Sequence, residues 1–318
     1  MRRPASYFTD RRNACQASFV AVLQSSLTAC KAVQEIALTL VRPENSRYAR
    51  PASSAAPNPL MWITPGRVFY AGLLGRPSVR KIGGTSIYIA QQAPIRVSIN
   101  GDDWLEGNLL LVPPYVPHCV TSDARFITDL IVEPETVEHE LLPAFMRDRS
   151  GIVHAPEFVK KVRHTLEQLR ARRDPLPLED AAFDQTFFGK ALPRSTLDRR
   201  VTLVLADIAK NPGDITSAAD YAARANVSFS RFVHLFKDEV GAPLRSFRSW
   251  KRARSILAYV TQNANLADIA QETGYPDSSH FSHSIRQVFG LTPKDVFAGS
   301  RRLQLHGESE AIAVRRRI

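Results

Sequence analysis

The sequence predicts an α+β fold in which a small β-barrel precedes an all-α domain with two helix-turn-helix motifs. Three observations lead to this prediction. A segment occurs twice between residues 217 and 297, short apolar runs separated by turn residues fill 62–134, and apolar residues recur at helical spacing over 135–190. The chain has 318 residues, enough for two domains.

The two copies of the repeated segment begin at Ser217 and Asn265. Each copy reads as a short helix, a tight turn and a second helix, the pattern of a helix-turn-helix unit. We expect Asn226 to adopt a left-handed backbone in the first turn and Ser228 to cap the helix that follows, while Gly274 supplies the second turn. The sequence therefore predicts tandem motifs of one kind.

The second helix of each copy keeps polar and basic residues on the face that is not expected to be buried. In the first copy these are Ser228, Ser230, Arg231, His234 and Lys237, and in the second Ser279, His280, Ser282, His283 and Arg286. Side chains of these types can bond base edges and phosphates in a major groove. We expect both sets to contact DNA.

A linker helix of about 18 residues is expected between the copies, over 243–260, and would span roughly 27 Å. Its basic residues include Arg248 and Arg252, and none of its neighbours is acidic. We predict phosphate contacts for these two arginines, and the alternative is a solvated basic face.

Residues 193–300 resemble the DNA-binding domain of the AraC/XylS family of bacterial transcription regulators. The resemblance rests on many spaced positions: Ile269, Ala270, Gly274, Tyr275, Ser279, His280, Phe281, Ser282, Arg286, Phe289, Gly290, Thr292, Pro293 and Phe297. His283, Ile285 and Ala298 depart from the usual family residues. The resemblance implies double-stranded DNA as partner, RNA polymerase as a candidate partner, no cofactor and no catalytic residue.

Composition agrees with a nucleic-acid partner. The formal net charge is +11 and the isoelectric point is about 9.9. The three cysteines lie far apart without a CxxC pair, which predicts neither a disulfide framework nor a zinc site and fits the cytoplasm. The run from Ala14 to Val41 is too polar for a membrane-spanning helix, so we expect neither export nor membrane binding.

Residues 61–135 are predicted to form the barrel. The stretch 107–118 resembles the second sequence motif of cupins, with Gly107, Pro113 and His118 in place and departures at Tyr115 and Ser122. The partner motif with two histidines is missing, and one histidine cannot build a three- or four-ligand site, so no metal is expected. The alternative is a cupin-type metal-dependent enzyme fused to a DNA-binding domain.

The resemblance implies that the barrel senses a small molecule or dimerises the protein. Barrel interiors can hold one small ligand. The predicted lining residues are Arg80, Tyr88, Arg96, Trp104 and His118, and the alternative is that they are ordinary core or surface residues. We therefore expect a cytoplasmic, sequence-specific transcription regulator controlled by a small molecule or by formation of a homodimer.

The remaining segments complete the domain prediction. Residues 1–60 are expected to be a poorly ordered or helical extension that is dispensable, and 301–318 a basic C-terminal tail. Residues 136–192 should form a helical connector with an amphipathic helix around Phe158 to Leu169. That helix either forms a seam with a partner chain or packs against the barrel.

Overall fold

The computed structural model describes residues 58–147, 149–262, 265–299 and 303–306. The described elements all belong to one compact unit, residues 56–318. The expectations for residues 1–57 and for 307–318 lie outside the described residues. The predicted start of the barrel, Met61, lies inside the first strand, which begins at Leu60.

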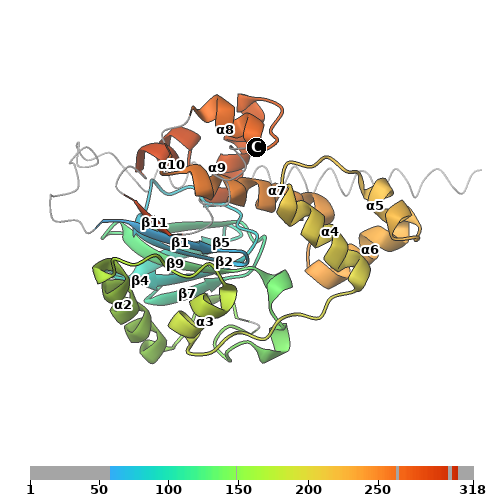
Figure 1. Cartoon of the computed structure of the whole chain (residues 1–318). Helices are drawn as coiled ribbons and strands as arrows, with labels where there is room; N and C mark the ends of the chain where they lie inside the picture. Colours follow the sequence, from blue (N-terminus) through green and yellow to red (C-terminus); the bar gives the residue numbers. More distant parts are fainter. Residues whose placement is uncertain (1–57, 148, 263–264, 300–302, 307–318) are drawn as a thin grey trace, which may run out of the picture. The chain divides into compact units, whose positions relative to one another are not determined.

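Two β-sheets form the N-terminal domain (Figure 1). The large sheet has the strand order β10-β7-β4-β9-β2-β1-β11 and the small sheet β3-β8-β5-β6. The large sheet contains β1 (Leu60–Thr64), β2 (Arg67–Leu73), β4 (Thr85–Ala90), β7 (Leu109–Val112), β9 (Phe126–Val132), β10 (Gly151–Ile152) and β11 (Gln304–His306). The small sheet contains β3 (Val79–Arg80), β5 (Ile95–Ile99), β6 (Leu105–Gly107) and β8 (His118–Ser122). The apolar runs recognised in the sequence correspond to β2, β4, β5, β7 and β9.

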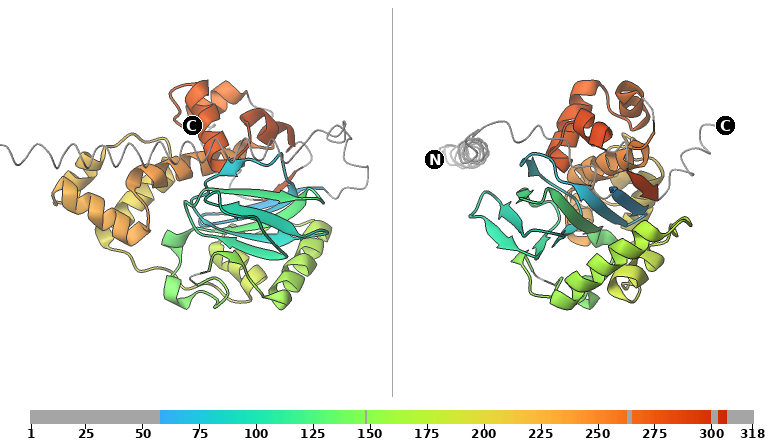
Figure 2. Two further views of the ribbon diagram at one scale, coloured as in Figure 1. Left: turned by 180° about the vertical axis from the view of Figure 1, so that it is seen from behind. Right: turned by 90° about the vertical axis from the view of Figure 1, so that its left-hand side faces the viewer.

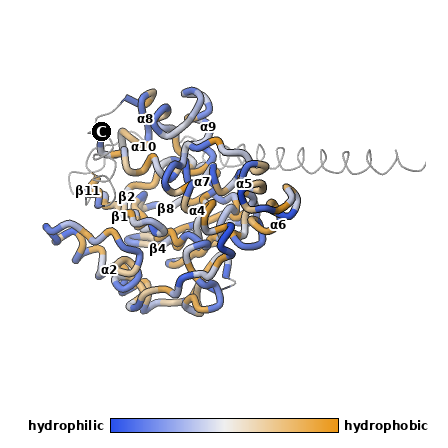
Figure 3. Tube along the Cα trace, turned by 45° about the vertical axis from the view of Figure 1, so that its right-hand side comes forward, coloured by the Kyte–Doolittle hydropathy of each residue, from blue (hydrophilic) through white to orange (hydrophobic). Residues whose placement is uncertain are grey.

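Strand alternation divides the large sheet into two buried faces. Ile87 and Ile89 of β4 belong to a core with helices α2 (Pro156–Ala171) and α3 (Asp180–Phe188). Tyr88 lies on the opposite face, in a core with Ile95 and Val97 of the small sheet. Because both faces are covered, hydrophobic residues concentrate along the strands (Figure 3).

Helix α2 packs against the sheet of its own chain. Its buried side chains are Val159, Val162, Thr165, Leu166 and Leu169. This bears out the expected amphipathic helix and places its apolar stripe in the intrachain core. Helix α3 is held by a buried ion pair, in which Arg67 Nε lies 2.8 Å from Asp184 Oδ1.

Seven helices follow the sheet domain within the described residues (Figures 1 and 2). They are α4 (Arg199–Lys210), α5 (Ala218–Arg224), α6 (Phe229–Val240), α7 (Leu244–Ser255), α8 (Leu266–Glu272), α9 (Ser278–Phe289) and α10 (Pro293–Gly299). A 3-10 turn, η4 (Ile256–Tyr259), extends α7. The expected tandem units are α5–α6 and α8–α9.

The two helix-turn-helix units bury their apolar residues in different places. Phe232 and Phe236 of α6 pack with α4 and Phe247 of α7 in a core of their own. Phe281 and Ile285 of α9 share a core with residues of β1, β2 and β9. The second unit is therefore built onto the sheet domain, which the sequence analysis treated as separate.

The linker helix differs from its predicted length and role. As an α-helix α7 has 12 residues, about 18 Å, because its end tightens into η4. Two of its cations point to the sheet domain rather than outward. Lys251 forms an ion pair with the buried carboxylate of Glu133 and lies 2.8 Å from Glu135, and Arg254 Nε lies 3.0 Å from Glu133.

Glu133 directly follows the last residue of β9, and its side chain bonds residues of α7. The indole Nε1 of Trp250 donates to Glu133 at 2.8 Å, and Arg254 also donates to the carbonyl oxygens of Thr64 and Arg67. Burial by itself raises the pKa of Glu133, but the charges of Lys251 and Arg254 outweigh it and lower that pKa to about 2. The carboxylate is therefore ionised at neutral pH.

The chain after α10 returns to the sheet domain. Strand β11 pairs in parallel with β1, with Gln304 opposite Leu60 and His306 opposite Trp62. The prediction of a tail from residue 301 is thus wrong for 304–306. A strand of three residues with one neighbour carries too little periodicity to be seen in a sequence.

We predict that Glu133→Gln destabilises the protein by ~3 kcal/mol, because removing one partner of a buried cluster leaves Arg254 without a counter-charge and Lys251 with Glu135 alone. Urea unfolding followed by tryptophan fluorescence measures the change. The matched control is Glu106→Gln, whose carboxylate is exposed and 4.0 Å from Arg96, and which should cost less than ~1 kcal/mol. Equal effects of the two changes would contradict the importance of Glu133.

Candidate DNA interface and interior polar cluster

Helix α6 presents its predicted contact residues to solvent. The Ser228 hydroxyl accepts from Arg231 N and caps the helix, and Asn226 in the preceding turn has the expected positive φ of 52°. Ser228, Ser230, Arg231, His234 and Lys237 are all exposed. Burial of Phe232 and Phe236 fixes the helix rotation so that these polar residues share the free face.

Helix α9 has the same design with a different cap. Asp277 accepts from the backbone N of Ser279 and of His280, each at 2.8 Å, and its second oxygen lies 2.7 Å from His280 Nδ1. These hydrogen bonds lower the pKa of Asp277. Ser279, His280, His283 and Arg286 are exposed, while Ser282 is half-buried.

The two arginines of α7 that were predicted to contact phosphates, Arg248 and Arg252, have interaction partners inside the protein. Arg248 donates to the carbonyl oxygen of Thr216 and lies over the ring of Tyr221 at 5.3 Å. Arg252 donates weakly to Gly213 and lies over Tyr275 at 5.5 Å. Both guanidinium groups therefore join the linker helix to the helix-turn-helix units, and contact of either with DNA stays a prediction.

Phe229, the first residue of α6, was not among the predicted contact residues. Its side chain is 58 % exposed beside the predicted contact residues. An aromatic side chain at this end of a recognition helix can contact a thymine methyl group. The sequence could have indicated this residue, because the predicted cap at Ser228 makes Phe229 the first residue of the helix.

A second group of predicted residues meets between the two sheets. Arg80 of β3 pairs with His118 of β8, and the hydroxyl of Tyr88 lies 2.7 Å from His118 Nε2. Asp129 of β9 is the direct cross-strand partner of Tyr88 in β4. All four are nearly or fully buried, with Arg80 8 % exposed.

His118 is neutral and has both ring nitrogens occupied. Nδ1 lies 2.9 Å from the Val116 carbonyl oxygen, so it carries the proton, and Nε2 accepts from Tyr88. Burial lowers the pKa of His118 to about 3. No ring nitrogen is free to bind a metal ion, and no group of three or more candidate metal ligands occurs among the described residues.

Several buried polar atoms around Arg80 have no hydrogen-bond partner. They are Nε and Nη2 of Arg80, Oγ of Ser86, Oγ of Ser122 and Oδ1 of Asp129. Such atoms in a protein interior are normally satisfied by water or by a ligand. Ser86 and Ser122 were not among the predicted ligand residues. Ser86 shares a strand face with Tyr88 in β4, and Ser122 shares one with His118 in β8, which the alternation of strand residues would have indicated.

Arg96 and Trp104 do not join this cluster. Arg96 lies between the inward-facing Ile95 and Val97, so it points outward, where it is bonded to Asp123 at 2.5 Å. Trp104 is 39 % exposed. Strand alternation places Arg96 on the face opposite the cluster, and Trp104 lies just before β6 (Leu105–Gly107), so a ligand contact by either residue stays a prediction.

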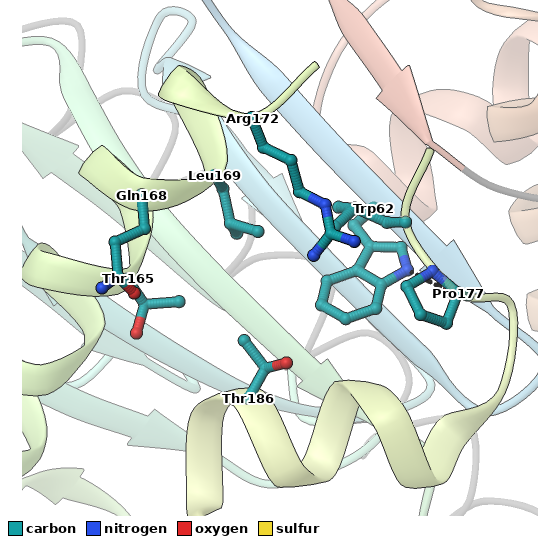
Figure 4. Close-up of a pocket in the computed structure, with 8 residues that line it drawn as sticks. Trp62, Thr165, Gln168, Leu169, Arg172, Pro177 and Thr186 are labelled. Carbon is teal, nitrogen blue, oxygen red and sulfur yellow. Dashed lines mark hydrogen bonds between the residues drawn. The ribbon is translucent and has the colours of Figure 1, made fainter. Parts of the chain in front are cut away.

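A separate hollow of about 320 Å³ lies between α2, α3 and β1 (Figure 4). Trp62, Leu169 and Arg172 are among its lining residues, and the Trp62 indole donates to the Pro177 carbonyl oxygen at 2.8 Å. None of the predicted ligand residues lines it. Its arginine is exposed to solvent, unlike Arg80.

We predict that Asp129 makes stability depend on pH near neutrality. Burial raises its pKa to about 7, against the opposing effect of Arg80, while the unfolded value is about 3.9. Between these values the folded protein keeps a proton that the unfolded chain loses. The free energy of unfolding therefore falls by ~1.4 kcal/mol for each pH unit in this window.

Asp129→Asn should abolish this fall, and urea unfolding at pH 5, 6 and 7 measures it. The control Asp123→Asn changes an exposed carboxylate and should leave the slope as in the unmodified protein. A slope unchanged by Asp129→Asn would contradict the assignment.

Comparison with known proteins agrees with this architecture. Residues 221–299 match the family model of a helix-turn-helix domain. Over 71 residues the chain is 33 % identical to the invasion protein InvF of Salmonella typhi and of Salmonella typhimurium, a match covering 22 % of this chain and 33 % of each relative. The fold is also similar to the crystal structure of apo ToxT from Vibrio cholerae, with a TM-score of 0.52 at 10 % sequence identity. The match covers 74 % of this chain and 97 % of the ToxT chain.

These findings bear on different parts of the molecule. The chain spans about a third of the length of the curated relatives it matches. The likeness to ToxT shows the fold, a β-sheet domain followed by a helical domain. Within the described ranges, no helix is long and apolar enough to cross a membrane. The comparisons therefore show a helix-turn-helix domain over residues 221–299, in a fold that pairs it with a β-sheet domain.

Proposed function

We propose that this regulator reads two neighbouring major-groove segments of DNA with α6 and α9, and that a small carboxylate held by Arg80 controls its binding. The proposal rests on two observations: the exposed faces of the two recognition helices, and a buried guanidinium in the sheet domain, Arg80, whose Nε and Nη2 have no hydrogen-bond partner. Action on chromosomal DNA would put the protein in the cytoplasm.

The DNA-binding part rests on charge and on helix ends. Arg231 and Arg286 lie on the free faces of α6 and α9 and carry no salt bridge within the described residues. An arginine can bond two acceptors of one guanine. The serines at the start of each helix offer hydroxyl groups for phosphates or bases.

The ligand-binding part rests on the unpartnered atoms of the cluster. Nε and Nη2 of Arg80 form a fork that suits the two oxygens of a carboxylate. A donor on the same ligand could then bond Oδ1 of Asp129. The cupin-like character of the two-sheet domain belongs to this proposal, since the cluster lies between the two sheets, where a cupin-like barrel would hold its ligand.

We expect Arg231→Ala and Arg286→Ala each to weaken specific DNA binding by ~1–3 kcal/mol, because each removes a bidentate base contact. The probe is a set of DNA sites selected from a random library by the full chain. Footprinting should show two protected segments about one helical turn apart, of which Arg231→Ala erases one and Arg286→Ala the other.

The matched control is Arg96→Ala, which removes an exposed arginine of the sheet domain and should leave both segments protected. A uniform loss on matched and scrambled DNA would identify phosphate contacts instead of base contacts. Unchanged affinity in both recognition-helix variants would overturn the assignment of these faces.

We expect a small carboxylate to raise the melting temperature of the protein through Arg80. Acetate, lactate, benzoate and glycine are the probes, and lactate and glycine add a donor for Asp129. At about 100 times its Kd a ligand adds ~2.7 kcal/mol, or roughly 5 °C for a protein of this size. Arg80→Met should abolish the increase and Arg96→Met should keep it. If no probe separates the two variants, the carboxylate proposal fails.

A further inference from the structure

One short segment connects the Arg80 cluster to the DNA-binding helices. We call residues 78–84, which include β3, the β3 segment. Its contacts reach the interior of the sheet domain, the last turn of α9 and the indole of Trp250 in α7. No other segment of the sheet domain between Leu60 and Val132 donates a backbone hydrogen bond to α9 among the described residues.

Toward the interior, the β3 segment contributes Arg80. Cα pairing with His118 puts both residues on one face of the small sheet. The charge of Arg80 acts on Tyr88 and Asp129, whose hydroxyl and carboxyl groups face the same cluster. A ligand bound at this guanidinium therefore bears directly on β3, which contains only two residues.

Toward the helices, the β3 segment satisfies the end of α9. The backbone N of Lys81 donates to the carbonyl oxygen of Gln287 at 2.9 Å, and the Ser78 hydroxyl donates to that of Gly290. The last carbonyl groups of a helix have no partner inside the helix. Here the sheet domain supplies two of the missing donors, Lys81 N and the Ser78 hydroxyl. A shift of the β3 segment therefore loosens the last turn of α9.

The same segment supports α7. A Cβ atom at Gly83 would lie 2.2 Å from the Trp250 ring, so backbone and indole are in direct contact. Ile82 is part of the core that contains Trp250, Phe281 and Val288. Movement of β3 is thus transmitted both to the recognition helix and to the helix that carries it.

Among the described residues the β3 segment donates no backbone hydrogen bond to α6, which meets the sheet domain at the 3-10 turn Pro134–Thr136 instead. The C-cap of α6, Gly241, is the counterpart of Gly290 in the repeat and has a similar φ, 74° against 69°. A Cβ atom at Gly241 would meet nothing within 4 Å, whereas one at Gly290 would meet Ser78. The two recognition helices therefore differ in their connection to the Arg80 cluster.

We propose that the β3 segment transmits the state of the Arg80 cluster to α9 and leaves α6 unchanged, so that control acts on one of the two DNA segments. This inference rests on the proposed function of Arg80. It predicts a regulator that keeps one DNA contact in both states and gains or loses the other.

Hydrogen exchange of the full chain, measured by mass spectrometry without DNA, tests the coupling. In Arg80→Met the amides of residues 286–291 should exchange at least fivefold faster than in the unmodified protein, while those of 236–241 keep their rates. Arg96→Met, a change of the same kind on the outer face, should alter neither set. Ser78→Ala should reproduce the effect on 286–291 without any change in the cluster.

Footprinting provides the functional measurement. Arg80→Met and Ser78→Ala should weaken protection of the segment read by α9 at least fivefold and leave the segment read by α6 protected. If Arg80→Met also accelerates exchange in β4 and β9, the cluster itself has lost structure in that variant. The two measurements are then repeated with Arg80→Lys, which keeps the positive charge.

The outcomes separate this inference from the ligand proposal. Equal responses of the two helices, or no response of α9 to either variant, would overturn the coupling even if a carboxylate binds. A selective response of α9 would support it even if none of the carboxylate probes raises the melting temperature.

Discussion

The carboxylate of Glu133 is the interaction on which the arrangement of the domains depends. It is completely buried, and two cations and one indole of α7 converge on it. Bringing these charges out of water is costly, and only their mutual attraction with complete hydrogen bonding offsets that cost. A linker helix held in this way has one allowed position on the sheet, so Glu133 fixes where the second helix-turn-helix unit begins.

This constraint makes the two halves of the repeat unequal. The α8–α9 unit shares its core with β1, β2 and β9, whereas the α5–α6 unit has a core closed by α4 and Phe247. The segment between α4 and α5 approaches the α8–α9 turn at Gly213 and Gly274, and the φ of 77° and the lack of a side chain at Gly274 permit the contact. Two copies of one motif thus have different surroundings: the α8–α9 unit shares a hydrophobic core with the sheet, whereas α6 meets the sheet domain at the 3-10 turn Pro134–Thr136.

Local patterns in the sequence predicted the elements better than their partners. The cap at Ser228, the turn at Asn226 and the buried face of α9 all follow from residues within one or two helical turns. The cations of α7 could not be interpreted in the same way. A basic run looks the same whether phosphates or a carboxylate more than 100 residues away in the sequence neutralise it, so the role of Lys251 was visible only in the fold. The same limit explains why β11 was missed.

The interior cluster shows where such long-range information matters most for function. From the sequence, Arg80, Arg96 and His118 were equivalent candidates, and strand pairing decides between them. It brings Arg80 beside His118 and turns Arg96 to solvent. Because the ring nitrogens of His118 are occupied by Tyr88 and a carbonyl group, the chemistry left at the cluster is hydrogen bonding and charge. The proposed recognition of a carboxylate by Arg80 uses both of these interactions.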